Sequence, residues 1–264
     1  MKRKVMLISA ILVLLLGGFT VYAVTSRTNN ITHEKRISKD KKAAPPKKLS
    51  KAEAKKINDK FYSHKLINDG GLMDFVGYPS TFSGLVKSGD LTVDGEIIDL
   101  KSYVSDNRPY TVAKLRINDV LDGDSKKFNG KTIRVMFLGG NITRKEDAAF
   151  SHLKVESGTD PNEIITIENG NNRLPMAGDM VALILSKETS GTNNIPGKFW
   201  SISFACKGAF FQDSDGKYRR VPEPQGIGGG GGFEDLTSQK DDEKMNDAMN
   251  SLINKTKNKD SKKN

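Results

Sequence analysis

The chain has 264 residues, a formal net charge of +10 at pH 7 and a single cysteine, which excludes an intramolecular disulfide. The charge is uneven: residues 1–60 hold 15 Lys and Arg against 4 Asp and Glu, whereas residues 61–232 hold 20 against 21. Because a nucleic-acid-binding domain is expected to carry its basic patch on the fold itself, the alkaline pI does not indicate one.

Residues 1–25 consist of a basic head and an apolar segment. Residues 5–24 contain no charge, and about 20 apolar residues are enough to cross a bilayer as a helix. The small-residue pattern that ends at Ala23 fits signal-peptidase cleavage equally well. Basic residues beyond the segment argue for a cytoplasmic body, but a basic head followed at once by an apolar block is the usual layout for export. We therefore expect a signal peptide or membrane anchor, with the rest of the chain on the extracellular face of the cell membrane or secreted after cleavage near Ala23.

Residues 26–49 form a basic stalk. A polybasic segment beside a bilayer attracts anionic lipid by roughly 1 kcal/mol per Lys or Arg, and anionic wall polymers outside a Gram-positive cell offer the same charge. The alternative is a solvated spacer that self-repulsion keeps extended. The residues expected to contact anionic lipid or wall polymer are Lys35, Arg36, Lys39, Lys41, Lys42, Lys47 and Lys48.

Residues 50–71 are predicted to form a lead-in helix. Ser50 and Glu53 have the spacing of a capping box, and Ile57 and Phe61 follow at helical spacing. The sequence Asn-Asp-Gly-Gly then ends the helix. Because its apolar stripe is thin, the helix is expected to pack on the edge of the following domain.

Residues 72–223 change to a period of two and predict a β domain. Strands are expected within 108–138, at 164–167, 180–186, 199–211 and 217–221, and as short segments in FVGY, TFSGLVK and GEIIDL. Many short strands, glycine-rich turns and no βαβ alternation predict a mainly β fold, a small antiparallel barrel or sandwich. A barrel is slightly favoured because closure removes exposed edges.

Four stretches of this domain also carry a resemblance. They read VAKLRINDVLDGD, GKTIRVMFLGGN, LPMAGDMVALIL and GKFWSISFACKGAFF. Their succession of Gly-Asp, Gly-Lys and Pro-x-x-Gly-Asp turns, over about residues 108–221, resembles an uncharacterised OB-like β-barrel domain of exported, membrane-tethered Gram-positive proteins. The resemblance implies an extracytoplasmic barrel and transfers no catalytic residue. Small barrels of this general kind often bind oligomers on an open face, which is an analogy of fold.

The usual catalytic and cofactor motifs are missing from the sequence. It has no Gly-x-Ser-x-Gly elbow, His-Glu-x-x-His pair, phosphate-binding loop or dinucleotide fingerprint. Residues 213–216 begin like a calcium loop, but the twelfth position is Pro224 where a Glu is required, so a hairpin turn is favoured. No cofactor and no metal site is predicted.

Cys206, His152 and either Arg219 or Arg220 are the candidates for a catalytic site. Their order along a chain with a basic head, an apolar segment and a β-rich body is similar to that of sortases, whose Cys attacks a peptide carbonyl while an Arg steadies the oxyanion. The sequence before Cys206 is Ile-Ser-Phe-Ala, where sortases carry Thr-Leu-x-Thr. At a strand period of two, Cys206 would also share an apolar face that turns its thiol into the core. That face would hold Trp200, Ile202 and Phe204. A structural cysteine is therefore favoured.

Residues 224–233 are predicted to be a glycine-rich linker and residues 234–264 a charged tail. An amphipathic helix is expected from about 239 to 256, with apolar residues on one side. Because isolated helices of this length are marginal in water, the helix either docks, on the body or on a protein partner, or frays in solvent. The residues proposed to contact a partner are Met245, Met249 and Leu252.

These features predict an exported, membrane-associated binding or scaffolding module of the Gram-positive cell envelope, without a defined catalytic activity. One alternative is a sortase-like cysteine transpeptidase or hydrolase that uses Cys206. A second alternative is an OB-like barrel that binds nucleic acid or oligosaccharide, although the neutral body disfavours nucleic acid.

Overall fold

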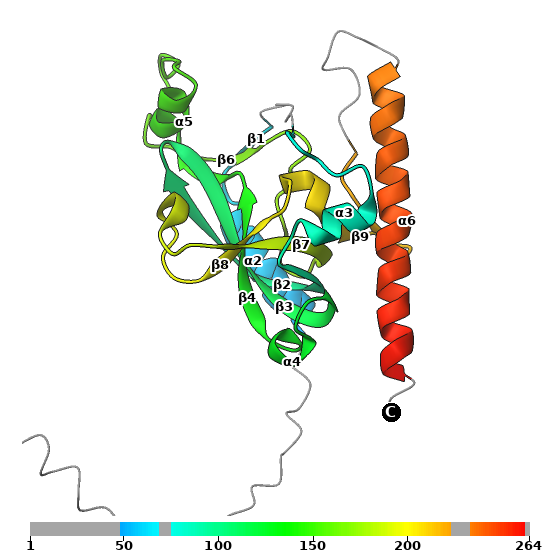
Figure 1. Cartoon of the computed structure of the whole chain (residues 1–264). Helices are drawn as coiled ribbons and strands as arrows, with labels where there is room; N and C mark the ends of the chain where they lie inside the picture. The colour runs from blue at the N-terminus through cyan, green and yellow to red at the C-terminus, as the bar shows by residue number, and fades with distance from the viewer. Residues whose placement is uncertain (1–47, 69–74, 223–232, 262–264) are drawn as a thin grey trace, which may run out of the picture. The chain divides into compact units, whose positions relative to one another are not determined.

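A computed structural model describes residues 48–68, 75–222 and 233–261 (Figure 1). The expected signal peptide or anchor at residues 1–25 lies outside the described residues, as do the basic stalk up to residue 47 and most of the predicted linker. Within the described ranges, no helix is both long and apolar enough to cross a membrane.

The described fold is mainly β, as the sequence predicts, and contains two sheets. The larger sheet has seven strands in the order β10-β9-β7-β2-β3-β4-β8. The strands are β2 (Leu91–Ser105), β3 (Arg108–Asp122), β4 (Thr132–Leu138), β7 (Met180–Glu188), β8 (Phe199–Ile202), β9 (Ala209–Gln212) and β10 (Tyr218–Arg219).

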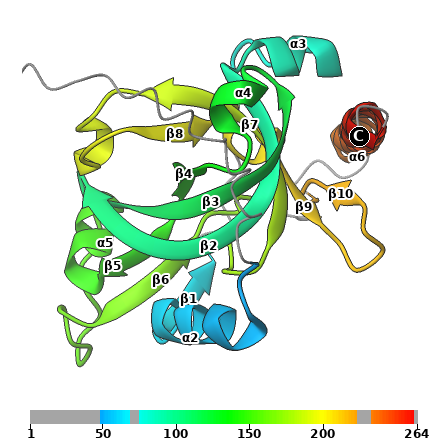
Figure 2. The ribbon, with the colours of Figure 1, turned by 90° about the horizontal axis from the view of Figure 1, so that it is seen from below.

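Five of these strands pair in a closed ring. β7 hydrogen-bonds to β2 on one side and to β8 on the other, so β2, β3, β4, β8 and β7 follow one another around the ring (Figure 2). The core cluster lies inside it and includes Val93, Leu115, Val135 and Leu183, all fully buried. We call these strands the five-strand ring.

The expectation of antiparallel pairing is wrong at two places. β4 and β8 pair in parallel, with Val135 opposite Trp200, and β1 and β6 are also parallel. The first departure has a topological cause: strand direction cannot alternate all the way around a ring with an odd number of strands. At least one of the five pairs must therefore be parallel.

The β2–β3 hairpin is longer than the short strands that the sequence predicts, with 15 residues in each strand. Asp106 and Asn107 form its turn with φ of 50° and 59°, a conformation that Asp and Asn tolerate well. Register shifts bend β2 near Gly95, where an added Cβ would lie 2.3 Å from the Arg116 carbonyl oxygen. Only glycine fits there, so Gly95 allows β2 to curve closely against β3.

The smaller sheet has the order β1-β6-β5, from β1 (Lys65–Asn68), β6 (Ile164–Glu168) and β5 (Gly140–Thr143). Helix α5 (Arg144–Phe150) follows β5 and begins with a capping box between Thr143 and Glu146. Ile142, Ile165 and Ile167 form the buried apolar side of this sheet.

Helix α2 (Lys51–Phe61) confirms the capping box between Ser50 and Glu53. It ends ten residues earlier than the expected lead-in segment, because the chain turns at Tyr62 and enters strand β1. Asn58 bonds both backbone groups of Ala177, with Nδ2 3.0 Å from the carbonyl oxygen and Oδ1 2.8 Å from the amide nitrogen. The helix therefore packs on the edge of the domain, as predicted.

Two expected strands are wrong, and a third is divided into β8 and β9. Residues 75–78 form a turn, and residues 82–87 form helix α3 (Phe82–Lys87), because the Thr81 side chain caps the amide of Gly84. The expected strand 199–211 stops at Ile202, where Phe204 and Ala205 adopt positive φ and begin the 3₁₀ turn η2 (Ala205–Gly208). The remaining short helical elements are α4 (Ser125–Phe128) and the 3₁₀ turn η1 (Thr192–Asn194).

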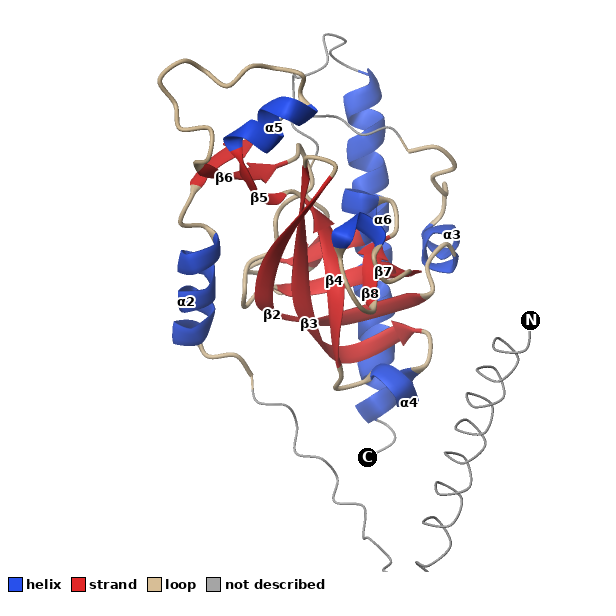
Figure 3. Ribbon diagram, turned by 90° about the vertical axis from the view of Figure 1, so that its left-hand side faces the viewer, coloured by secondary structure: helices blue, strands red, loops and turns tan. Residues whose placement is uncertain are grey.

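Helix α6 (Phe233–Ser261) is longer than the predicted 239–256 and docks on the body beside α3 and β10 (Figures 1 and 2). Figure 3 shows α6 as a long helix. Met245, Met249 and Ile253 are buried in a second core cluster with Leu85 and Phe210. Full burial stabilises a side chain of this size by about 1.5–3 kcal/mol. Packing therefore holds a helix that would be marginal alone.

Candidate ligand-binding face

The outer face of β2, β3 and β4 presents polar and aromatic side chains in registered rows. The residues that alternate with them, such as Ala113 and Val135, point into the core of the five-strand ring. From the hairpin tip downward, the rows are Tyr103, Tyr110 and Leu138; Lys101, Val112 and Met136; and Asp99, Lys114 and Arg134.

This face has more positive than negative side chains. Lys114 forms an ion pair with Asp99, with 2.7 Å between Nζ and Oδ2. Among the described residues, neither Lys101 nor Arg134 pairs with a carboxylate. Two cations therefore remain available to an anion from solution.

Tyr103 contacts both of these cations. Lys101 Nζ is 4.9 Å and Arg134 Cζ is 6.0 Å from the centroid of its ring, and Arg134 Nη2 donates to the Tyr103 hydroxyl at 3.3 Å. Cation–π contacts at exposed sites contribute about 0.5–1 kcal/mol each. One aromatic ring thus contacts both cations in the absence of a ligand.

The loop of residues 189–198, between β7 and β8, forms one wall of the face. Ile195 and the following Phe199 are fully buried and pack against Val112. Arg134 Nη1 donates to the carbonyl oxygen of Pro196 at 2.5 Å, which ties the guanidinium to this wall. A groove results between the loop and the strands, lined by Asp99, Lys101, Tyr103, Val112, Lys114, Arg134 and Pro196. We call these seven residues the ligand-binding face.

The ligand-binding face has the chemistry of a binding site. It combines cations, one tyrosine and a buried valine floor, and its lining includes neither a thiol nor an imidazole. In the part of the chain that the structure describes, no group of three His, Cys, Asp or Glu residues could hold a metal ion. The arrangement can attract and orient an anion, and the tyrosine offers a surface for a ring or sugar.

Cys206 lies in the 3₁₀ turn η2 rather than on a strand, so the predicted face shared with Trp200, Ile202 and Phe204 does not exist. Its burial is nevertheless as expected, with 6% of the residue exposed. Its backbone amide donates to Asn172 Oδ1 at 3.1 Å. The thiol lines an inner hollow with Phe137, Ala209 and Phe211, an apolar setting that suits a structural role.

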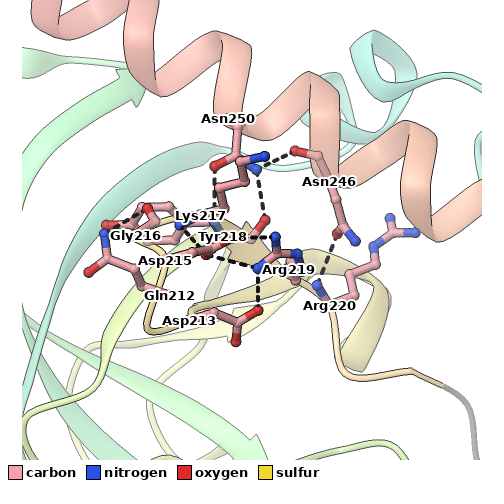
Figure 4. A network of polar contacts seen from close by, with 10 residues as sticks. All are labelled: Gln212, Asp213, Asp215, Gly216, Lys217, Tyr218, Arg219, Arg220, Asn246 and Asn250. Atoms are coloured by element: carbon pink, nitrogen blue, oxygen red, sulfur yellow. Dashed lines mark hydrogen bonds and ion pairs between the residues drawn. The ribbon is translucent and has the colours of Figure 1, made fainter.

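His152 and Arg219 lie elsewhere in the fold. His152 is exposed in the turn after α5, with φ of 54°. Arg219 is on β10, where its guanidinium contacts Asp213 at 2.5 Å and Asp215 at 2.6 Å within the same hairpin (Figure 4). The pKa of Asp215 is lowered by the hydrogen bond from Arg219. Arg219 thus stabilises the hairpin turn at residues 213–216 that the sequence predicts.

Arg220, the next residue, belongs to a buried charge cluster under α6. Its side chain is 1% exposed, and its Nη1 lies 3.0 Å from Asp242 and 3.2 Å from Asp241. Lys207 also reaches Asp242 at 3.3 Å, and Tyr78 accepts from Arg220 Nη2 at 2.8 Å. These ion pairs place the acidic part of α6 against the basic part of the body.

Asparagines of α6 complete the free edge of strand β10. The Tyr218 amide donates to Asn250 Oδ1 at 2.9 Å, and the Arg220 amide donates to Asn246 Oδ1 at 2.9 Å (Figure 4). Asn250 Nδ2 returns a bond to the Tyr218 carbonyl oxygen at 2.8 Å. One turn apart on the helix, the two amides replace a neighbouring strand and cover the sheet edge.

A carboxyl group on β2 lies in the interior, within reach of the charge of Lys257 on α6. Asp94 on β2 is 2% exposed and accepts bonds from the Asp119 amide and, at 3.4 Å, from the Tyr218 hydroxyl. Burial, with the nearby Asp119 charge, raises the pKa of Asp94 to about 6, and Lys257 of α6 opposes the shift.

Two of the three α6 residues proposed for partner contact are buried against the β domain. Met245 and Met249 are completely buried, whereas Leu252 is half-buried. A protein partner for this helix stays a prediction. The stalk lysines, apart from Lys48, lie outside the described residues.

The sequence reasoning did not single out Lys101, Tyr103 or Arg134. The signal was present, because Asp99, Lys101 and Tyr103 alternate along one face of β2. It was missed because the strand expected in GEIIDL ended at Leu100, whereas β2 continues to Ser105.

No family model, curated protein or solved structure matches the chain. The resemblance to extracytoplasmic OB-like domains therefore stays a prediction.

Proposed function

We propose that the chain is an exported, membrane-associated binding module of the Gram-positive cell envelope, and that its five-strand ring works as a small OB-type barrel. The apolar segment at residues 5–24, the basic head before it and the stalk after it support export. The resemblance of residues 108–221 supports the same compartment.

The proposed ligand is an anionic, chain-like polymer that lies across the ligand-binding face. The observation that carries this proposal is that Lys101 and Arg134 both contact Tyr103 and have no carboxylate partner among the described residues. An anion would give both cations a partner of opposite charge. The cost in side-chain conformational entropy would be small, because Tyr103 and Pro196 already hold the Arg134 guanidinium in place.

The position of the face supports a polymer. OB-type barrels bind oligonucleotides and oligosaccharides across their second and third strands and the adjoining loops. In the order of the ring those strands correspond to β3 and β4, and the adjoining loops to residues 106–107 and 189–198. This is an analogy of fold, and the ligand class rests on the charges.

Binding of the full chain in nanodiscs of zwitterionic lipid tests the proposal. We expect poly(glycerol phosphate), an anionic wall-type polymer, to bind, and uncharged dextran not to bind. The double variant Lys101→Ala/Arg134→Ala should bind poly(glycerol phosphate) about tenfold more weakly, a loss of about 1.4 kcal/mol.

A control is Lys154→Ala, which removes an exposed charge that does not line the groove. An equal loss in the control, or no loss in the double variant, would contradict a specific face. Tighter binding of single-stranded DNA than of poly(glycerol phosphate) would instead support the nucleic-acid alternative.

A further inference from the structure

A second hollow lies on another part of the molecule, between α3, the end of β3 and α6. Its apolar lining comes from all three elements and consists of Phe82, Val86, Leu121, Ala248 and Leu252. Figure 1 shows α3 directly beside α6. We call this hollow the α3–α6 pocket.

The apolar residues of the pocket are only partly covered. Phe82, Val86 and Leu121 pack against the second core cluster but are half-buried, as are Ala248 and Leu252. The pocket thus exposes one side of a hydrophobic core to solvent. Hydrophobic free energy is gained with each methylene group that covers such a surface, so an alkyl chain would bind favourably.

The rim of the pocket is mainly basic. Lys87, in the last turn of α3, and Lys255, on α6, are exposed and face the same hollow from opposite helices. Neither forms an ion pair within the described ranges, and the pocket lining has one carboxylate, Asp122. An apolar interior below two unpaired cations fits a molecule with an alkyl tail and a negative head.

We propose that the α3–α6 pocket binds a single long-chain carboxylate, with its alkyl chain on the five apolar residues and its head between Lys87 and Lys255. A hollow walled by two helices and a strand suits one flexible chain better than a protein helix, which needs an open groove. This site is separate from the ligand-binding face, and the proposal does not rest on the polymer.

Binding at this site is coupled to the docking of α6. Ala248, Leu252 and Lys255 belong to α6, so the pocket exists only while the helix is seated. A ligand that binds only the docked state stabilises it, by about 2.7 kcal/mol at a concentration 100 times its dissociation constant. The carboxylate would therefore protect α6 from proteolysis.

Photolabelling of the full chain tests the site directly. A diazirine-bearing fatty acid is added to membrane vesicles that contain the protein, the sample is irradiated, and labelled peptides are located by mass spectrometry. We expect the label within residues 82–87 and 248–255. Excess dodecanoate should reduce it at least tenfold, whereas inorganic phosphate and dodecyltrimethylammonium should not.

Three variants separate the pocket from its surroundings. Ala248→Trp fills the hollow without adding charge, and Lys87→Glu/Lys255→Glu reverses the rim. Each should lower labelling of the two segments about tenfold, while Lys240→Glu, an exposed change on α6 away from the pocket, should leave it unchanged. Limited proteolysis verifies that α6 stays docked in each variant.

Wild-type labelling in Ala248→Trp with α6 docked would overturn the site. Label confined to residues 1–47 would overturn it as well, because the apolar segment alone would then attract the probe. Equal competition by dodecyltrimethylammonium would refute the role of Lys87 and Lys255.

Discussion

The interface under α6 and the ligand-binding face both contain charged side chains, but these charges have different partners. Under α6, Arg220 is buried against Asp241 and Asp242. On the ligand-binding face, Lys101 and Arg134 are accessible and contact an aromatic ring instead of a carboxylate. Charges paired in the interior make the position of α6 depend on both partners, whereas charges left without a carboxylate partner are available to a ligand.

The largest expected effect follows from removing a buried charge. Arg220→Met leaves Asp242 buried with half its partners, so it should lower the free energy of unfolding by about 3–5 kcal/mol and release α6. Urea denaturation measures the first effect and limited proteolysis the second.

The neighbouring residue provides the control. Arg219 makes exposed ion pairs, so Arg219→Met should cost no more than about 1 kcal/mol. Equal losses for the two variants would show that burial does not distinguish these arginines.

A pH-dependent effect of intermediate size comes from Asp94. Its pKa in the folded protein, about 6, lies above the ordinary value of 3.8, so the folded state holds a proton between these values that the unfolded state has lost. The free energy of unfolding therefore falls as the pH rises from about 4 to 6, by about 3 kcal/mol in total, and the cost persists above pH 6.

Asp94→Asn should remove this dependence, because the amide does not titrate. Relative to wild type, the variant gains stability between pH 4 and pH 7, as urea denaturation at the two values would show. Comparing the two pH values cancels any constant effect of the substitution. Parallel curves for both proteins would mean that Asp94 titrates normally.

The asparagines of α6 should have a smaller effect. Asn250→Ala leaves the Tyr218 amide and carbonyl of β10 without their partner, at a cost of about 1–3 kcal/mol. Hydrogen exchange should show faster exchange of the Tyr218 amide, with β2 and β3 unchanged. Asn254→Ala, an exposed change one turn further along α6, should leave that amide protected.

The smallest effect on stability belongs to the ligand-binding face. Arg134→Ala removes solvent-accessible hydrogen bonds to Tyr103 and Pro196, so it should lower the free energy of unfolding by no more than about 1 kcal/mol. Thermal unfolding tests this value. A loss of unfolding free energy as large as that of Arg220→Met would show that Arg134 has a structural role and would contradict this prediction.

Short sequence patterns correctly predicted those parts of the fold that depend on interactions between residues close together in the sequence. The capping box at Ser50, the period-two alternation of β3 and β4, and the apolar side of the tail helix all appear in the structure. The parallel β4–β8 pair could not be read from either strand, because ring closure sets it.

The candidate site was less predictable because it also depends on contacts between residues that are distant in the sequence. Lys101 and Tyr103 lie on β2, and Arg134 lies on β4, 33 positions after Lys101. Only the pairing register of β2, β3 and β4 brings them together. Cys206 illustrates the opposite case: its burial was predicted, but for the wrong reason, since positive φ at Phe204 and Ala205 ends the strand.

The salt dependence of polymer binding tests the contrast between paired and unpaired charges most directly. Each phosphate contact contributes about 0.7–0.9 to the slope of log affinity against log salt concentration in nucleic acids. If Lys101 and Arg134 each contact one phosphate, the slope for poly(glycerol phosphate) should be shallower by about 1.4–1.8 in Lys101→Ala/Arg134→Ala than in wild type. Identical slopes would contradict the account.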